Sequence, residues 1–308
     1  MMRGKNLTIS LLLSMAILGG GSSYAAAQII IEPLFEYPAP PEDMEGLQER
    51  SDYLMNHFWD DFDFSRTGAV DQNALNDAFN VYTTAMRYAE RGVALSSVNT
   101  LLKRLKGNPV LLLQFTKAAE EYLYGPRATI WSDEVYIPFL KALISDKGVS
   151  EARKQRYKMH LDVLQRNAPG MKFPEIRLTL KDGRHTDFKP QSPVTIVEFG
   201  NPDCDDCRFS KLKLEMAHDV ATWIENGEVG MAFIVADAVP EDQADILAQL
   251  KDYPSQWIAG ICYGGDDIFD IRSTPSFYLI DRNGKIIAKN LDVTQAVNMI
   301  RDIKENSK

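Results

Sequence analysis

The spacing of the hydrophobic residues changes once along this chain, at the Pro- and Gly-containing stretch NAPGMKFPEI (167–176). Before it, apolar residues recur every three or four positions, as in LNDAFNVYTTAMRYA (75–89), which is typical of amphipathic helices. Beyond it, short β-branched runs alternate with helical segments. We therefore predict an all-α domain over residues 28–165, which opens with a Pro-rich extended arm, followed by an α/β sandwich over residues 166–308.

Individual elements of the second half follow from local patterns. Alternation around Asp182-Gly183 predicts a β-hairpin, and Asn283-Gly284 predicts another. Fully apolar runs predict buried strands, and residues 204–226 have a helical pattern. The segment AGICYGGDD (259–267) is predicted to be a loop or a helix end. The predicted buried strands are VTIVEF (194–199) and GMAFIVA (230–236). The predicted last helix is the amphipathic segment VTQAVNMIRDI (293–303).

The first residues are typical of an export signal. Arg3 and Lys5 precede a short apolar run, which small residues follow, so that Ala27 fits the −1 position of a cleavage site. We predict a signal peptide over residues 1–27, cleavage before Gln28, and a periplasmic mature protein. An uncleaved membrane anchor is the alternative, although the apolar run is short for a membrane span.

Two of the three cysteines stand three positions apart in GNPDCDDCRFS (200–210). A bridge between Cys204 and Cys207 would stabilise the fold little, because disulfide stabilisation grows with the length of the closed loop. The pair supplies two ligands where a zinc site usually takes four, and the four histidines are dispersed. A redox centre is therefore the favoured interpretation, with a structural disulfide and a metal-binding site as the alternatives.

The helix predicted to begin at Cys204 gives the two sulfurs different surroundings. Residues i and i+3 share a helix face, with Cβ atoms roughly 5–6 Å apart, so the pair can form a disulfide with little backbone movement. At the helix N-terminus, backbone N–H groups and the helix dipole favour a Cys204 thiolate, whereas Cys207 lies one turn inside. We expect Cys204 to attack a substrate disulfide and Cys207 to resolve the mixed disulfide.

At these residues the second half resembles the thioredoxin superfamily, in its exported TlpA/ResA-like branch. VEFGNPDCDDC (197–207) is similar to the strand–turn–CxxC segment, STPSFYLID (273–281) to the segment with the cis-proline, and APGMKFPEIRLTLKDGR (168–184) to the extra N-terminal hairpin. The resemblance implies a central mixed sheet flanked by helices. It also implies a thiol-disulfide oxidoreductase that acts on protein thiols or disulfides. The helical half resembles uncharacterised domains that precede such modules.

The resemblance assigns roles by motif position. Cys204 matches the attacking thiol and Cys207 the resolving thiol. Pro275 matches the cis-proline, and Thr274 the residue that offers its backbone to an extended substrate. Glu198 matches the buried acid that can shuttle a proton to the resolving thiol. Alternatively, Pro275 is an ordinary loop proline that precedes a strand. Alternatively, Glu198 lies at the end of a strand with its side chain in solvent.

The sequence departs from the family pattern at two places. Asp203 stands where the family has Trp, and Asp205-Asp206 stands where it has Gly-Pro or Pro-His. Negative charge near Cys204 disfavours its thiolate and therefore the reduced form, which predicts a reductant rather than an oxidant. Solvent screening limits this tuning by Asp205 and Asp206, so only its direction is predicted.

Other classes fit less well. A peroxiredoxin signature would need Pro at Val197 and Thr or Ser at Asn201, and a copper-delivery protein of related fold would need a later His, whereas none follows His218. We expect no metal and no cofactor. A net charge of −9 without a basic run argues against nucleic acid as a partner. Cys262 is expected to be a free thiol, with a relay to the pair as the alternative.

The expected partners are protein thiols or disulfides and a membrane or periplasmic electron donor. One alternative belongs to a different class of function. The helical half would then be a binding or scaffolding module for an envelope partner, and the redox module would be secondary.

Overall fold

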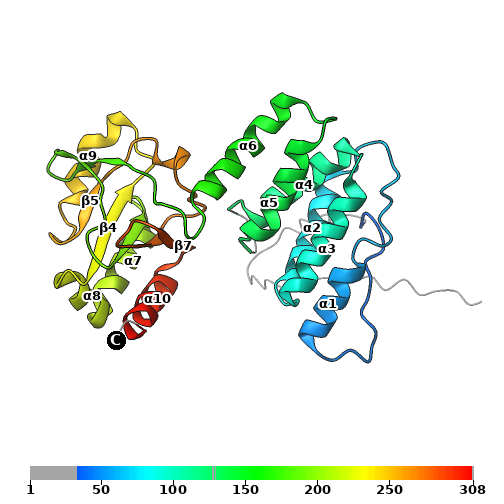
Figure 1. Ribbon diagram of the computed structural model, residues 1–308, viewed down its shortest axis with the longest axis horizontal. Helices are drawn as coiled ribbons and strands as arrows, with labels where there is room; N and C mark the ends of the chain where they lie inside the picture. The colour runs from blue at the N-terminus through cyan, green and yellow to red at the C-terminus, as the bar shows by residue number, and fades with distance from the viewer. Residues whose placement is uncertain (1–32, 127, 129, 307–308) are drawn as a thin grey trace, which may run out of the picture. The chain divides into compact units, whose positions relative to one another are not determined.

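The computed structural model describes residues 33–126, 128 and 130–306, so the predicted signal peptide and its cleavage site lie outside the described residues. The chain from Pro33 onward forms one compact unit. It contains a helical region followed by a mixed sheet flanked by helices, which confirms the predicted fold class (Figure 1). None of the helices in these described ranges is long and apolar enough to cross a membrane.

Helices fill the first part of this unit, as the apolar spacing predicts. Several begin at capping residues: Asp71 accepts a hydrogen bond from the Ala74 N–H, and Asn108 accepts one from Leu111, with Pro109 in the first turn. Such caps satisfy N–H groups that have no partner inside the helix. The helices are α1 (Leu47–His57), α2 (Gln72–Met86), α3 (Arg91–Leu105), α4 (Pro109–Leu123), α5 (Asp133–Ser145) and α6 (Glu151–Arg166).

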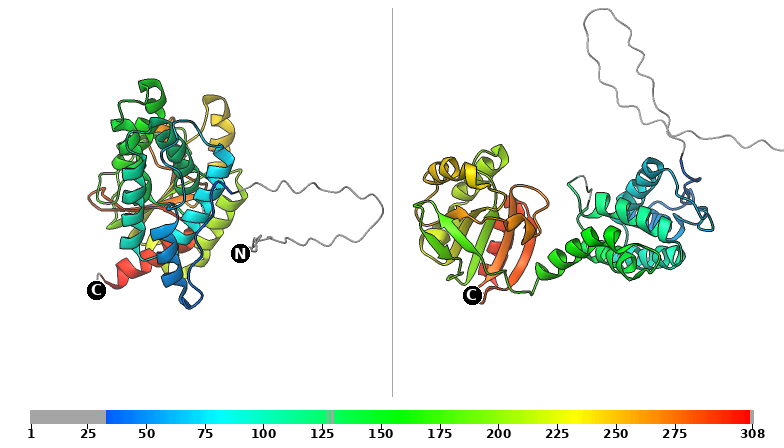
Figure 2. Two further views of the ribbon diagram at one scale, coloured as in Figure 1. Left: turned by 90° about the vertical axis from the view of Figure 1, so that its right-hand side faces the viewer. Right: turned by 90° about the horizontal axis from the view of Figure 1, so that it is seen from above.

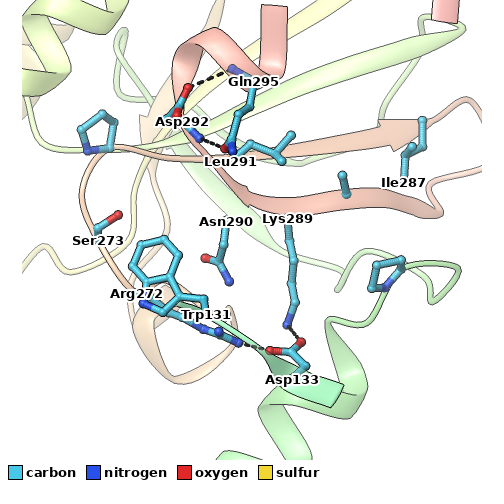
Figure 3. A pocket seen from close by; sticks show the side chains of 13 residues that line it. Trp131, Asp133, Arg272, Ser273, Ile287, Lys289, Asn290, Leu291, Asp292 and Gln295 are labelled. Carbon is cyan, nitrogen blue, oxygen red and sulfur yellow. Dashed lines mark hydrogen bonds and ion pairs between the residues drawn. The ribbon is translucent and has the colours of Figure 1, made fainter. Parts of the chain in front are cut away.

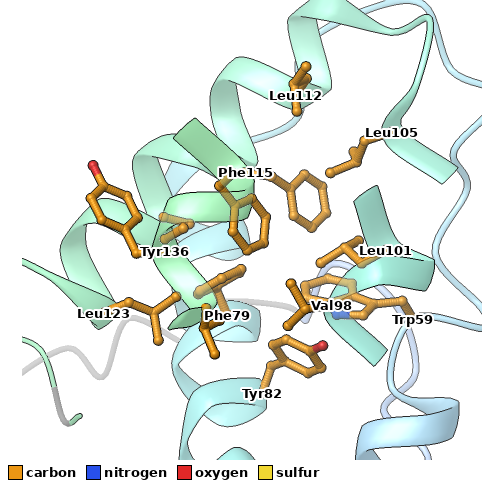
Figure 4. Packing of buried hydrophobic residues seen from close by; sticks show 14 of the residues in the cluster. Trp59, Phe79, Tyr82, Val98, Leu101, Leu105, Leu112, Phe115, Leu123 and Tyr136 are labelled. Atoms are coloured by element: carbon orange, nitrogen blue, oxygen red, sulfur yellow. The ribbon is translucent and has the colours of Figure 1, made fainter. Parts of the chain in front are cut away.

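Aromatic side chains form the core of the helical region (Figure 4). The indole of Trp59 lies 5.0 Å from the ring of Phe115 and 5.4 Å from that of Tyr82, both edge to face. Phe79 and Tyr82 on α2 are fully buried. The stretch HFWDDFDF (57–64) therefore supplies core residues, as its composition suggests.

A single seven-stranded sheet lies in the described part of the second half (Figure 2). Its order is β2-β1-β5-β4-β3-β6-β7, with β3, β4 and β5 parallel to one another and the other pairs antiparallel. Both predicted hairpins are present as β1–β2 and β6–β7. The strands are β1 (Arg177–Leu180), β2 (His185–Asp187), β3 (Val194–Phe199), β4 (Val229–Val235), β5 (Ile258–Ile261), β6 (Ser276–Asp281) and β7 (Ile286–Leu291).

Two predictions about the second half are wrong in detail. The segment 259–267 was predicted to be a loop or a helix end, but its first three residues belong to β5 (Ile258–Ile261), which pairs with β1 and β4. The helix predicted over 204–226 is divided at Ala217 into α7 (Asp205–Met216) and α8 (His218–Glu225). An unbroken helix would continue the buried face of α7 towards Glu225. The break turns the apolar Val220 and Ile224 inward instead.

Strand β3 positions the site because its side chains alternate between two buried clusters. Ile196 belongs to the cluster that also holds Cys207, whereas Val197 and Phe199 belong to the cluster on the opposite face. Glu198, two residues after Ile196, therefore points towards the face that α7 covers. The other helices around this cluster are α8, α9 (Gln243–Leu250) and α10 (Val293–Glu305).

Candidate active site

Cys204 is the N-cap residue of α7. Its backbone is extended, with φ −80° and ψ 123°, and its Sγ accepts a hydrogen bond from the Cys207 N–H at 3.2 Å. The side chain is half-buried, so a substrate can reach the sulfur. An unpaired N–H group at a helix start is a donor suited to negative charge. The structure thus presents the Cys204 sulfur to solvent and to a donor that would stabilise a thiolate.

Cys207 lies one turn into α7 and is fully buried. Burial raises the pKa of its thiol well above the ordinary range, and the neighbouring Cys204 raises it further. Gly200 makes this burial possible, because a Cβ there would lie 3.1 Å from Cys207 Sγ and 2.8 Å from the ring of Phe233. The two thiols therefore differ in access, and the buried Cys207 is held protonated, in the sense that an attacking and a resolving thiol require.

The segment containing Thr274 and Pro275 faces the exposed sulfur. The Thr274–Pro275 peptide bond is cis. Cys204 Sγ lies 3.9 Å from the Thr274 carbonyl oxygen, across 70 residues of sequence. The structure thus brings together Cys204, Cys207, Thr274 and Pro275, which were selected from separate segments of the sequence.

Glu198 is buried beneath the pair, with none of its surface exposed, so it does not face solvent. Its Oε1 lies 2.5 Å from Ser210 Oγ, which lies 2.9 Å from the Cys207 carbonyl oxygen. Because a hydroxyl carries one hydrogen, Ser210 cannot donate to both oxygens. When Glu198 is ionised, Ser210 donates to it; when Glu198 is protonated, it can donate to Ser210, which is then free to donate to Cys207. Burial raises the pKa of Glu198 to about 8 and outweighs the opposite effect of the Ser210 hydrogen bond.

Replacing Glu198 with Gln is expected to change how stability depends on pH. Above about pH 5 the unfolded chain loses the Glu198 proton, whereas the folded chain keeps it until about pH 8. The folded state then binds more protons, so wild-type stability falls by up to about 1.4 kcal/mol per pH unit in this window. The variant has no such proton. Urea unfolding of both proteins at pH 5 to 8 should show that the unfolding free energy of the variant increases relative to that of wild type as pH rises.

Glu215→Gln is the matched control, because Glu215 lies on the exposed surface of α7. It should follow the wild-type pH dependence throughout. A constant difference between Glu198→Gln and wild type from pH 5 to 8 would show that Glu198 is ionised in the folded protein.

The two aspartates between the cysteines are exposed. Asp205 forms an ion pair with Arg208, whose guanidinium also bonds to the Pro202 carbonyl oxygen. Asp206 and Asp205 lie in the first turn of α7, where negative charge is favourable for the helix itself. Since Arg208 offsets part of the charge of Asp205, the tuning of Cys204 stays a prediction of direction only.

Cys262 lies apart from the pair. It is buried in the cluster with Val197 and Phe199, on the face of the sheet opposite Cys207. Burial raises the pKa of its thiol. This placement favours the expected free thiol over the alternative of a relay, because the sheet separates Cys262 from Cys207.

Sequence analysis did not identify Ser210 or a buried ion cluster near Thr274. Ser210 could have been found, because it stands three positions after Cys207 on one helix face. The cluster joins Asp270 and Arg272, just before Thr274, to Lys289 of β7 and Asp133 of α5. Figure 3 shows the contacts of Asp133 with Arg272 and Lys289. The cluster had no local signal, because Asp133 and Arg272 are 139 residues apart.

Two cations and two anions make up this cluster. Arg272 donates to both carboxylate oxygens of Asp270, at 2.8 and 3.0 Å, and also binds Asp133. Lys289 Nζ lies 2.5 Å from Asp270 and 2.8 Å from Asp133. Burial by itself raises the pKa of Asp270, but Arg272 and Lys289 outweigh it and lower the pKa below its usual value. The ring of Tyr124 lies 4.8 Å from the guanidinium carbon of Arg272.

Nothing in the described ranges assembles three or more His, Cys, Asp or Glu side chains in an arrangement that could hold a metal ion. The site is therefore described by its thiols, Glu198 and the Thr274–Pro275 segment.

Comparison with known families places the first half of the chain. A family model described as a domain of unknown function, DUF5106, matches residues 10–167, about half of the chain. The chain belongs to this family. The match ends one residue beyond α6, which finishes at Arg166. No curated protein matches the chain.

One solved structure resembles this chain over most of its length. A thioredoxin-like protein from Bacteroides caccae is 22% identical, with a TM-score of 0.69 over 88% of this chain and 99% of that one. The fold is therefore thioredoxin-like. A conserved protein of unknown function from Bacteroides fragilis (25% identical, TM-score 0.40) matches over 43% of this chain and 98% of its own. The thioredoxin domain of a thiol-disulfide oxidoreductase from Bacteroides vulgatus (22%, TM-score 0.36) matches over 44% and 97%. Membership of the TlpA/ResA-like branch stays a prediction.

Proposed function

We propose that the protein is an exported thiol-disulfide oxidoreductase that reduces disulfides in proteins of the periplasm. The observation that carries the proposal is the geometry at the start of α7. A half-exposed Cys204 accepts a hydrogen bond from the helix and faces Thr274, while Cys207 is buried one turn below. Scaffold proteins do not need such an unequal pair of thiols, whereas disulfide exchange does.

The reaction follows from this inequality. The Cys204 thiolate attacks one sulfur of the substrate disulfide, forms a mixed disulfide and releases the other substrate sulfur as a thiol. Cys207 then attacks Cys204, which releases the second substrate thiol and leaves a Cys204–Cys207 disulfide. Two electrons have passed to the substrate, and a thiol donor in the envelope must return them. In its ionised form, the buried Glu198 can accept the Cys207 proton before the second step, and its pKa of about 8 makes this form the minor one at neutral pH.

Insulin reduction by the full chain, with dithiothreitol as the electron source, tests the activity. The reduced protein should accelerate the precipitation of the insulin B chain well above the rate with dithiothreitol alone. A rate equal to that of dithiothreitol alone, in a protein whose Cys204 and Cys207 both titrate as thiols, would overturn the proposal.

The predicted effect of the two aspartates on the reduction potential is tested by changing Asp205 to Gly and Asp206 to Pro together. Removing both negative charges should stabilise the Cys204 thiolate and raise the reduction potential. The rise should not exceed about 30 mV, because exposed charges interact weakly through solvent. Equilibration with glutathione, alongside thiolate absorbance, measures the change. Glu215→Gln controls for loss of an acidic group elsewhere on α7, and a potential that falls would contradict the electrostatic account.

A further inference from the structure

A cavity of about 730 Å³ lies beside Pro275 and draws its walls from distant parts of the chain (Figure 3). Five consecutive residues of β7 and its end, Ile287 to Leu291, form one wall. Trp131 and Asp133 of the helical region form another, next to Arg272 and Ser273. The cavity therefore adjoins the segment that contacts Cys204, and the helical region helps to shape it.

The β7 wall of this cavity is the free edge of the sheet. β7 is the last strand in the order and pairs with β6 on its other side. At its beginning the edge is covered, because Ile286 exchanges backbone hydrogen bonds with Gly170 and Met171. From Ile287 to Leu291, no backbone partner other than β6 is present in the described part of the chain. Such an edge can accept another extended strand.

Two cations at the cavity are paired with carboxylates. Arg272 and Lys289 are neutralised by Asp133 and Asp270, and Asp292 accepts a hydrogen bond from Gln295 in the capping box of α10. The carboxylate of Asp292 therefore leaves one negative charge at the α10 end of the cavity, which disfavours an anionic ligand. The cavity surface is mixed, and its largest apolar side chain is Trp131, which is 38% exposed and whose Nε1 already donates to the Gly125 carbonyl oxygen.

Position links this cavity to the reacting sulfur. Pro275 lines the cavity, and the residue before it, Thr274, has its carbonyl oxygen 3.9 Å from Cys204 Sγ. A substrate chain bound at the Cys204 sulfur would lie next to the Thr274–Pro275 segment, and Pro275 is part of the cavity wall. A small disulfide would occupy the sulfur end and leave the cavity unused.

We propose that this cavity binds an extended segment of the substrate polypeptide, which adds to the free edge of β7 and packs an apolar side chain against Trp131. The inference rests on the proposed function and names its substrate class as polypeptide disulfides. The helical region acts here as one wall of the substrate cleft, through the loop that holds Trp131.

The test compares two substrates in the full chain. One is a disulfide-bonded peptide with apolar residues flanking the cysteine, and the other is hydroxyethyl disulfide. Trp131→Ala should lower kcat/KM for the peptide about tenfold more than for the small disulfide, as expected for loss of one central contact. Peptides carrying one N-methylated amide should lose rate at alternate positions, because alternate residues of an added strand bond to the edge.

Tyr88→Ala is the control, because Tyr88 is an exposed aromatic residue of the helical region that does not line the cavity. It should leave both rates unchanged. Equal losses on both substrates with Trp131→Ala, or N-methylation that has no effect at any position, would overturn the inference while leaving the proposed function intact. A dimer that Trp131→Ala dissociates would assign the edge to a second copy and would also overturn it. Wild type inactive on both substrates would overturn the proposed function itself.

Discussion

Serine in place of Cys204 is expected to abolish insulin reduction by the full chain, with a loss of about a thousandfold or more. The remaining thiols cannot substitute. Cys207 is buried and its pKa is raised, and Cys262 is buried on the opposite face of the sheet. A hydroxyl in the place of the Cys204 sulfur forms no mixed disulfide. The measurement is the rate of insulin B-chain precipitation in the presence of dithiothreitol.

Cys262→Ser is the matched control and should retain the wild-type rate. Cys207→Ala adds a second readout, because it leaves Cys204 free to attack but removes the thiol that releases the substrate. This variant should accumulate a mixed disulfide that migrates as a heavier band and disappears on reduction. Activity that survives in Cys204→Ser but not in Cys262→Ser would move the reacting sulfur to the wrong side of the sheet and refute the assignment.

Alanine in place of Asp270 is expected to cost about 3–5 kcal/mol of unfolding free energy, because it leaves buried cations with too few anions. Asp270 is fully buried and bonds to Arg272, Lys289 and Asn290. Asp133 alone would then face two positive side chains. Urea unfolding at pH 7, followed by tryptophan fluorescence, measures the difference.

Asp267→Ala provides the control, since Asp267 is exposed three residues earlier, and it should change stability by less than about 0.5 kcal/mol. The effect of Asp270→Ala also has a definite pH dependence. Because the pKa of Asp270 is lowered in the folded state, its contribution is complete above about pH 4 and is lost as pH falls through the folded value. The two curves should therefore converge in acid. A gap that widens in acid would show that Asp270 is not the ionised partner of Arg272.

Most of the secondary structure could be predicted because the apolar spacing is regular. The helices of the first half and both hairpins follow local rules that act over a few residues, such as the turn at Asn283-Gly284. Strand β5 was not predicted, because IAGI (258–261) is short, contains Gly and shows no alternation of apolar and polar residues. The break at Ala217 could not be predicted, because nothing in the local sequence opposes a helix there. It depends on the packing of Val220 and Ile224 in the core, which only the tertiary structure defines.

The site was predictable to the extent that motifs mark it. The cysteine spacing and the Thr274-Pro275 dipeptide are local, and the structure places them together. The burial of Glu198 was not fixed by its sequence, because a strand-end Glu can face either way. Asp133 and Trp131 had no signal at all, since their role depends on contacts that only the tertiary fold creates.

The ion cluster also limits how this chain can be shortened. Asp133 comes from the helical half, whereas Arg272, Lys289 and Asp270 come from the thioredoxin-like half. A fragment that keeps only the second half retains two cations and one anion. It would therefore carry an uncompensated positive charge at Arg272, two residues from Thr274, whose carbonyl oxygen lies 3.9 Å from Cys204 Sγ. Excised in this way, the second half would have a different charge next to the Thr274–Pro275 segment from the one within the intact protein.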